Sequence, residues 1–430
     1  MCTSFATLDF LRRARARLVR VTTPQLTADA HRILWAQALR AFAYGFGAVL
    51  LGSTLDREGF SSGEVGFVLA AVVAGTVLSS LAVGWWGDRV GRRRSYVVLY
   101  LALALTGAVF AFSDQVWVLS AVALTGALST EVVESGAFTS LEQAMLATEL
   151  TGRTRLRGFG TYNAVATAAG SVGALAAGGP ELLRRVWSGA PVDQRFFLIF
   201  VPVAFAGAAV ACTLSHRVEA EPRSPEAGTR PRLQRSRPTV LRLAGLFALD
   251  SFGGGFVVQS FIAYWLAAEF NASIGVLGVV FFAVGLLQTA SFLAAPRLAE
   301  RFGILRTMVF THLPSNVLLA VIPLAPNLPA AIALLLARVA LAQMDVPTRQ
   351  AYVMALVDPD ERTPAAAVTN TARYAVRPVG PALAGVSQSI AFGLPFLLAG
   401  GIKSLYDVLL WRWFRTVPIP DEPASSDAPK

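Results

Sequence analysis

The chain has few charges, few cysteines and few histidines for its length. Of its 430 residues only 15% are charged, whereas 54% are hydrophobic. A soluble domain could not hide so much apolar surface, so the composition indicates a membrane protein. The two cysteines, Cys2 and Cys212, cannot form a disulfide framework or a CxxC metal site, and the three histidines are scattered. The sequence therefore offers no metal site, no cofactor site and no catalytic constellation of an enzyme.

Apolar segments long enough to cross a bilayer recur about twelve times. About 20 residues suffice to cross a hydrocarbon core of about 30 Å. We therefore predict an all-α membrane protein with twelve transmembrane helices. The expected spans are 33–53, 63–84, 95–113, 117–137, 159–180, 196–214, 240–266, 274–296, 305–324, 329–348, 365–387 and 392–412. The fourth and tenth spans are expected to continue at their cytoplasmic ends.

Basic residues are concentrated in alternate loops. Arginines precede the first expected span and follow the second, fourth, sixth and eighth spans, whereas the opposite loops hold few. The positive-inside rule then places both termini in the cytoplasm, with the chain integral to the plasma (cytoplasmic) membrane. The net charge of +10 reflects this topology, so we expect no nucleic-acid partner.

The sequence repeats itself at an offset of about 210 residues, the separation of Arg40 from Asp250. Segment 299–306 echoes 87–94, and 380–385 echoes 173–178. Such repeats predict two pseudo-symmetric six-helix halves. We expect a cytoplasmic arm at 1–32, an N-terminal half at 33–215, a cytoplasmic linker at 216–238, a C-terminal half at 239–415 and a disordered tail at 416–430.

The loop between the second and third spans carries a distinctive motif. Its sequence GWWGDRVGRRR fills every fixed position of the pattern G-x-x-x-D-R-x-G-R-R/K-R/K, with Gly84, Asp88, Arg89, Gly91, Arg92, Arg93 and Arg94. The motif resembles the corresponding loop of the major facilitator superfamily. The echo in the second half supplies Glu300, Arg301 and Gly303.

The resemblance implies a secondary transporter in which this loop is a conformational switch. Asp88 is then expected to meet the start of the eleventh helix and to close the cytoplasmic side. Thr363 and Pro364 predict that start, as its N-cap and first turn.

Ionisable side chains inside membrane spans are costly, so they are candidate functional residues. The candidates for substrate binding or coupling are Arg40, Glu131, Glu134, Asp250, Arg338, Asp345, Arg373 and Arg377. The resemblance places the first, fourth, seventh and tenth helices around a central cavity. Repeat-related positions carry opposite charges, which predicts an ion-pair network between the halves; a purely structural pairing is the alternative at each position.

Two further groups are interpreted as structural. Lys403 and Asp407 lie four residues apart, which favours an intrahelical pair. His312 is interpreted as a packing or hydrogen-bonding group.

These features predict a transporter, not an enzyme, that moves a small molecule by alternating access as a monomer in the lipid bilayer. The arginines among the candidates indicate an organic anion or zwitterion, and Asp250, Glu131 and Glu134 indicate coupling to a proton. One alternative is a proton antiporter for multidrug or amphiphile efflux, although Glu131 and Glu134 occur where such antiporters usually have an Arg. A transport-silent sensor or scaffold is the alternative of another class.

Overall fold

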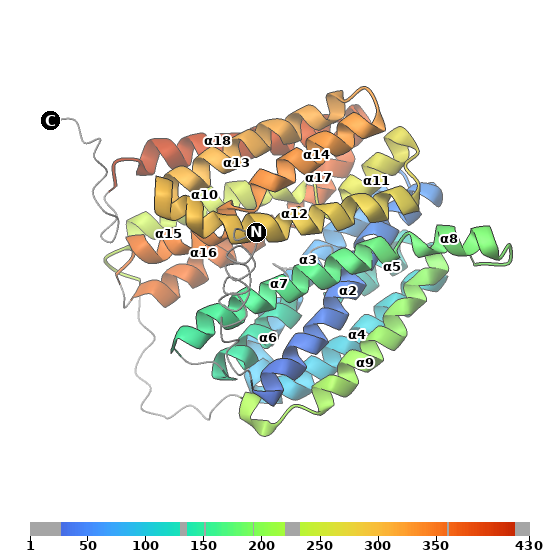
Figure 1. Cartoon of the computed structure of the whole chain (residues 1–430), viewed down its shortest axis with the longest axis horizontal. Coiled ribbons are helices and arrows are strands. Elements are labelled where there is room, and N and C mark those ends of the chain that lie inside the picture. Colours follow the sequence, from blue (N-terminus) through green and yellow to red (C-terminus); the bar gives the residue numbers. More distant parts are fainter. Residues whose placement is uncertain are drawn as a thin grey trace, which may run out of the picture.

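The computed structural model describes residues 27–129, 136–149, 152–191, 193–219, 233–358 and 361–417, with the side chains at 88, 147–149, 152–160 and 362–364 left out. The predicted switch residue Asp88 therefore has no described side chain. The candidates Glu131 and Glu134, and most of the predicted arm, linker and tail, lie outside the described residues. Figure 1 shows two helical bundles side by side, one coloured blue to green and the other yellow to red.

The N-terminal bundle starts with well-capped helices. Thr27 accepts a hydrogen bond from the backbone N–H of Ala30, and Ser61 forms a capping box with Glu64. The elements are α2 (Ala28–Arg57), α3 (Ser62–Val90), α4 (Arg92–Phe112), α5 (Val116–Ala123), α6 (Gly136–Glu149), α7 (Gly152–Ala176), α8 (Gly179–Val186), the 3₁₀ helix η1 (Asp193–Ile199), α9 (Phe200–Cys212) and η2 (His216–Val218).

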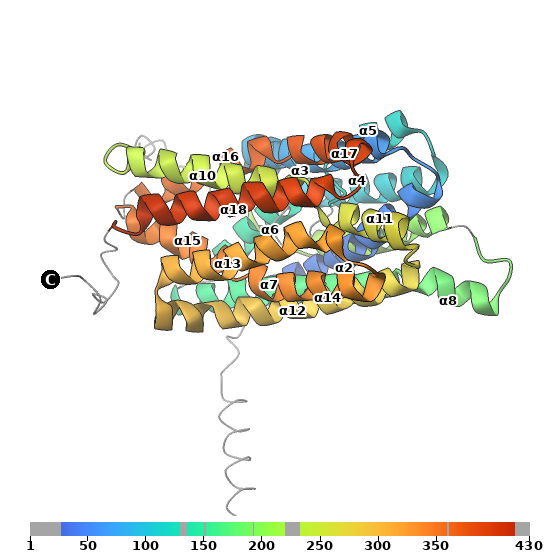
Figure 2. The ribbon, with the colours of Figure 1, turned by 90° about the horizontal axis from the view of Figure 1, so that it is seen from above.

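The C-terminal bundle repeats this arrangement, and its helices follow the same long axis when seen from above (Figure 2). Its elements are α10 (Arg237–Gly255), α11 (Gln259–Phe270), α12 (Ile274–Phe302), α13 (Ile304–Val321), η3 (Ile322–Leu324), α14 (Leu328–Ala342), α15 (Asp345–Leu356), α16 (Arg362–Val376), α17 (Val379–Ile390) and α18 (Leu394–Phe414). Three predicted spans of this half are thus each built from two helices in succession.

Within the described ranges, nine helices are long and apolar enough to cross a membrane. The predicted fourth, fifth and eleventh spans are not among them. The prediction of one continuous helix over 117–137 is wrong, because α5 ends at Ala123 and the chain is non-helical through residue 129. Gly126 has a φ of +71° there and lies against the backbone of Gly75 on α3. The continuations of the fourth and tenth spans are confirmed by α6 and α15.

The repeat is visible in two matching turns. Gly91 joins α3 to α4 with φ +99° and ψ 133°, and Gly303 joins α12 to α13 with φ +86° and ψ 154°. Each glycine N–H also closes the last turn of its preceding helix, at 3.0 Å and 2.9 Å. A positive φ strains any residue with a Cβ, so both positions require glycine. We call the end of the molecule with these two turns the motif end.

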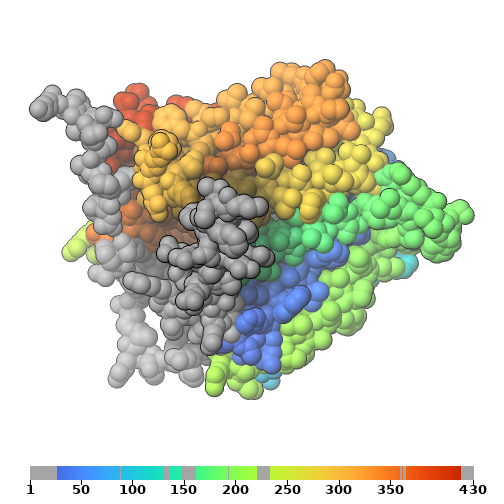
Figure 3. Space-filling model, viewed as in Figure 1, coloured from blue at the N-terminus to red at the C-terminus, as the bar shows by residue number. Residues whose placement is uncertain are grey.

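At the opposite end the two halves meet in a glycine-lined seam, where α3 crosses α17 and α7 crosses α12. A Cβ on Gly385 would lie 3.0 Å from Cα of Gly66, and a Cβ on Gly178 would lie 3.0 Å from Cα of Gly275. Gly178 and Gly385 occupy equivalent repeat positions, so the two crossings are copies of one contact. Figure 3 shows the green and yellow surfaces joined at this end.

A glutamate on α8 adds a polar contact to the seam. The Glu181 carboxylate accepts hydrogen bonds from the Ser273 hydroxyl and from the backbone N–H of Gly275, at 3.0 Å for the latter. These bonds, led by that of Ser273, lower the pKa of Glu181. The carboxylate thereby fixes the start of α12 in the second half to α8 in the first.

Two other glutamates fix helix starts at the motif end. Glu219 accepts from the backbone N–H groups of Arg92 and Arg93 at 2.6 and 3.3 Å, so the motif arginines hold the chain that follows α9. Glu361 accepts from three successive backbone N–H groups ahead of α10, at 2.7, 2.9 and 2.8 Å; they belong to Gln234, Arg235 and Ser236. These bonds, led by that of Ser236, lower the pKa of Glu361 to about 2.

The predicted cap of the eleventh helix needs correction. Helix α16 begins at Arg362, so Thr363 lies inside the first turn and not before it. The N-cap position falls on Glu361, whose carboxylate is turned to the start of α10 instead.

Candidate functional site

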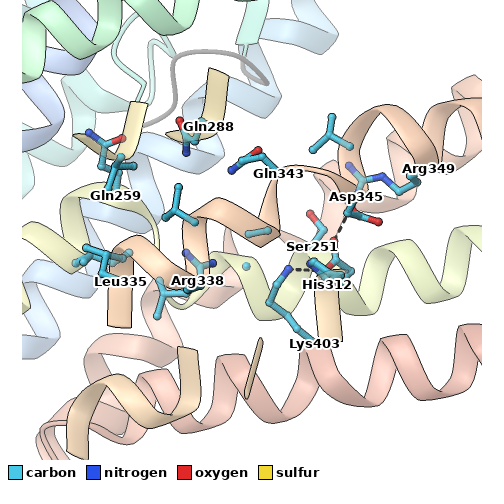
Figure 4. Close-up of a pocket in the computed structure, with 18 of the residues that line it drawn as sticks. Ser251, Gln259, Gln288, His312, Leu335, Arg338, Gln343, Asp345, Arg349 and Lys403 are labelled. Atoms are coloured by element: carbon cyan, nitrogen blue, oxygen red, sulfur yellow. Dashed lines mark hydrogen bonds and ion pairs between the residues drawn. The ribbon is translucent and has the colours of Figure 1, made fainter. Parts of the chain in front are cut away.

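A cavity of about 210 Å³ lies inside the C-terminal half, and we call it the charged cavity. Its wall combines cations and carboxylates with three glutamines, from α10 to α18. Figure 4 shows Arg338, Gln288 and Gln343 around one space, with His312 and Lys403 at its edge. The charged or titratable lining residues are Asp250, His312, Arg338, Asp345, Arg349, Arg373, Arg377 and Lys403.

A second cavity of about 290 Å³ lies between the two halves, and we call it the interfacial cavity. Its lining is mostly neutral and polar, with hydroxyl and amide groups contributed by both halves: Ser80, Thr139, Ser140, Gln143, Asn163, Gln350, Asn370 and Tyr374. Both cavities share Phe292, Val346 and Arg373 as lining residues. They are therefore adjacent, with Arg373 facing both.

Arg338 is the cation of the charged cavity that is least satisfied by the protein. It projects from α14, a helix that Asn327 caps by accepting from Ala330 N–H at 3.0 Å. Its Nε is buried and has no hydrogen-bond partner among the described residues. A buried guanidinium donor without an acceptor is costly, so a bound acceptor at this position would be stabilised.

Six side chains from four helices form a buried cluster at the edge of the charged cavity. Asp250 (α10) accepts from Lys403 (α18) and lies 3.4 Å from the Nη1 of Arg349, which also donates to Asp345 at 2.6 Å. Asp407 accepts from Asn316 at 2.8 Å. We call Asp250, His312, Asp345, Arg349, Lys403 and Asp407 the C-half cluster.

A different ion pair lies in the N-terminal half. Arg40 on α2 donates to both carboxylate oxygens of Glu142 on α6, at 3.0 and 2.7 Å, and both side chains are fully buried. Tyr96 and Tyr162 donate to the same carboxylate at 2.8 and 2.6 Å. The guanidinium also lies over the rings of Tyr44 and Phe138. This arrangement satisfies the carboxylate from every side and leaves it no contact with either cavity described above.

These contacts correct the predicted ion-pair network between the halves. In the described residues Arg40 pairs with Glu142 and Asp250 pairs with Lys403 and Arg349, so each pairing stays within its own half. The predicted Lys403–Asp407 pair is also wrong, because Lys403 turns to Asp250 and Asp407 turns to His312. Residues four apart on a helix can face one another, but Lys403 and Asp407 instead contact partners on other helices.

The structure brings most of the other candidates together. Arg338, Asp345, Arg373 and Arg377 all line the charged cavity, at the ends or breaks of α14, α15 and α16. The sequence reasoning missed Arg349 and Glu142 as partners. Arg349 follows Asp345 by four residues, a spacing that could have revealed it. Within the described ranges, no three His, Cys, Asp or Glu side chains are arranged as metal ligands.

Two repeat-related helical bundles that enclose a polar cavity are the arrangement of an integral membrane transporter of the two-halved type. The chain matches the family model described as "Major Facilitator Superfamily" over residues 33–264 and 243–430. It belongs to that superfamily.

Relatives and solved structures agree with this assignment. The chain is 27% identical over 414 residues to "Uncharacterized membrane protein YJR124C" of Saccharomyces cerevisiae, covering 88% of this chain and 92% of the relative. The crystal structure of the nucleoside transporter NupG superposes with a TM-score of 0.68 at 13% identity, covering 90% of this chain and 99% of NupG. A D-xylose-proton symporter gives a TM-score of 0.68 at 14% identity, covering 91% and 99%. At such identities the likeness concerns the fold, and it does not name a substrate.

Proposed function

We propose that this transporter moves a small organic anion or zwitterion by alternating access, coupled to protons. The observation that carries the proposal is the position of Arg338. Its buried Nε lacks an acceptor among the described residues and its side chain lines the charged cavity. A carboxylate or phosphate supplies the planar, charged acceptor that a guanidinium binds best.

The chemistry of the interfacial cavity supports a hydrophilic solute over an amphiphile. Hydroxyl and amide groups dominate its wall, as at Ser140, Gln143 and Asn163. Such groups pair with hydroxyls of a bound molecule but lose their hydration against an apolar one. An anion with a polar body can thus reach Arg338 while its remainder lies against neutral hydrogen-bonding groups.

The arrangement of the halves supports alternating access at the plasma membrane. With the basic loops in the cytoplasm, the seam of α3, α7, α12 and α17 closes the outer side. A transporter closed on its outer side is inward-facing, and rocking of the halves would exchange the closed side. Each half holds its own buried ion pairs, so neither has to break them during that movement.

The test uses purified, reconstituted protein and a panel of probes: lactate, glutamate, glucuronate, glucose and the lipophilic cation tetraphenylphosphonium. We expect the anions or the zwitterion to raise the unfolding temperature and to enter proteoliposomes saturably. Arg338→Gln should abolish both effects, Arg338→Lys should retain part, and Arg297→Gln on an exposed arginine should change neither. Stabilisation by tetraphenylphosphonium alone would support amphiphile efflux. Binding without any flux would support a sensor.

A further inference from the structure

A histidine lies between two buried carboxylates at the wall of the charged cavity. His312 is on α13 and is only 4% exposed. Its Nδ1 lies 2.9 and 3.1 Å from the two carboxylate oxygens of Asp407, and its Nε2 lies 3.8 Å from Oδ1 of Asp250. Each of the two ring nitrogens thus faces a carboxylate that can accept a hydrogen bond from it.

The charges of the C-half cluster point to a protonated, cationic His312. Three carboxylates, from Asp250, Asp345 and Asp407, meet two permanent cations, Arg349 and Lys403. Counted by themselves, the six side chains carry one net negative charge with neutral His312, in a place where water has little access; Arg338 acts on Asp250 from outside the cluster. A buried charge without a partner is strongly unfavourable, so a proton on His312 completes the balance.

Asp250 is less suited to hold the proton than His312. It already accepts from Lys403 and faces Arg349, so protonating it would leave two cations with too little negative charge. The other polar groups around His312 are Asn316 on its own helix and Tyr406 on α18, whose ring centroid is 5.8 Å from that of the imidazole. Neither is charged at neutral pH.

Three further cations line the same cavity without belonging to the cluster: Arg338, Arg373 and Arg377. Arg338 on α14 carries a positive charge, which disfavours a second positive charge on His312 while the cavity holds no anion. An anion bound to Arg338 removes that repulsion. Binding of the anion then favours binding of the proton, and by linkage the proton favours the anion to the same extent.

We propose that His312 carries the coupled proton, and that a proton on His312 and an anion at Arg338 stabilise each other so that the two cross together. The assignment makes the protein a symporter. The claim that anion and proton move together rests on the proposed function, which supplies the anion. The claim that His312 is protonated rests on the C-half cluster alone.

The first test measures the protonation state of His312 directly. Full-length protein with ¹⁵N-labelled histidine in lipid nanodiscs gives signals from three histidines, and the signal of His312 is the one lost in His312→Gln. We expect an imidazolium spectrum at neutral pH without any added solute. A neutral imidazole for His312 under these conditions would overturn the proposal, whatever the substrate is.

The second test measures the coupling between proton binding and anion binding, with sodium glucuronate as the probe and glucose as its uncharged control. In the pH range where His312 loses its proton, the Kd for glucuronate should rise about tenfold per pH unit, the slope for one linked proton. In His312→Gln the slope should be flat. In proteoliposomes this variant should exchange glucuronate across the membrane but no longer accumulate it under a proton gradient. His216→Gln, at an exposed histidine outside the cavities, should behave like the wild type.

A second variant keeps the proposal testable if His312→Gln does not fold. Asp407→Asn removes one carboxylate, so the cluster balances without a proton and should lose proton-driven accumulation as well. Proton-driven accumulation that persists in both variants, or release of a proton when glucuronate binds, would overturn the proposal. If glucuronate does not bind while His312 is an imidazolium, the substrate assignment fails and the proton site stands.

Discussion

Replacing Glu142 by Gln should destabilise the N-terminal half strongly. The carboxylate accepts four hydrogen bonds, two from Arg40 and one each from Tyr96 and Tyr162, in a site with no exposure to solvent. Glutamine keeps the volume but loses the charge, and its amide NH₂ faces donors where an acceptor is needed. The guanidinium of Arg40 is then a buried cation without a counter-charge.

The magnitude follows from that unpaired charge. Breaking a buried ion pair by removing one partner costs about 3–5 kcal/mol, whereas removing both partners is often close to neutral. We therefore expect Glu142→Gln to lower the free energy of unfolding by about 3–5 kcal/mol. The double variant Arg40→Gln/Glu142→Gln should recover most of this loss, because no charge remains buried.

Steric trapping in bicelles measures this free energy without requiring heat, which unfolds many membrane proteins irreversibly. Glu269→Gln on α11 is the matched control, since that glutamate is exposed; a change within about 0.5 kcal/mol is expected there. A loss below about 1 kcal/mol in Glu142→Gln, or a double variant no more stable than the single one, would refute the reasoning. If the double variant folds but no longer binds any anion of the panel, Arg40 acts in binding after all.

Two remaining predictions concern the two ends of the molecule. The pKa of the Glu361 carboxyl is lowered from 4.5 to about 2. The stabilisation that Glu361 contributes to the folded state is therefore complete above pH 4.5 and is lost as the pH falls from there towards 2. Glu361→Gln should remove this acid sensitivity and speed amide hydrogen exchange at residues 234–236. Unchanged exchange there would count against the contact. At the other end, Gly385→Ala places a methyl group against the Ser62 carbonyl and 3.0 Å from Cα of Gly66. This variant should open the seam and increase the labelling of a cysteine placed at Ser62. Gly401→Ala on α18 has open space around it and should leave the labelling unchanged. Equal labelling in both variants would show that the seam tolerates a side chain.

The sequence predicted the features that depend on local pattern. The long apolar segments predicted most helices, and the loop motif and its echo placed Gly91 and Gly303 between helices, where the structure has sharp turns. The repeat offset paired segment 173–178 with segment 380–385, and in the structure Gly178 and Gly385 make matching contacts. Each of these features is set by residues close in sequence, or by a copy of such residues.

The partners of the buried charges could not be predicted in the same way. Asp250 and Lys403 are 153 residues apart, and Arg40 and Glu142 are 102 apart. Which helices touch, and which face each presents, depends on the packing of the whole bundle. The sequence therefore identified Arg338, Arg373 and Arg377 as candidates, whereas the roles of His312 and Glu142 required the structure.

The seam and the cavities use different kinds of atoms, which bears on how such a transporter can evolve. The seam consists of glycine backbone at Gly66, Gly178 and their counterparts, where almost any substitution is an insertion of bulk. The cavities are walls of interchangeable side chains, such as Ser140 and Gln350. Selection can therefore alter what is transported, one wall residue at a time, without touching the positions that let the halves close. A lineage built on this plan can diversify its cargo while its gate stays fixed.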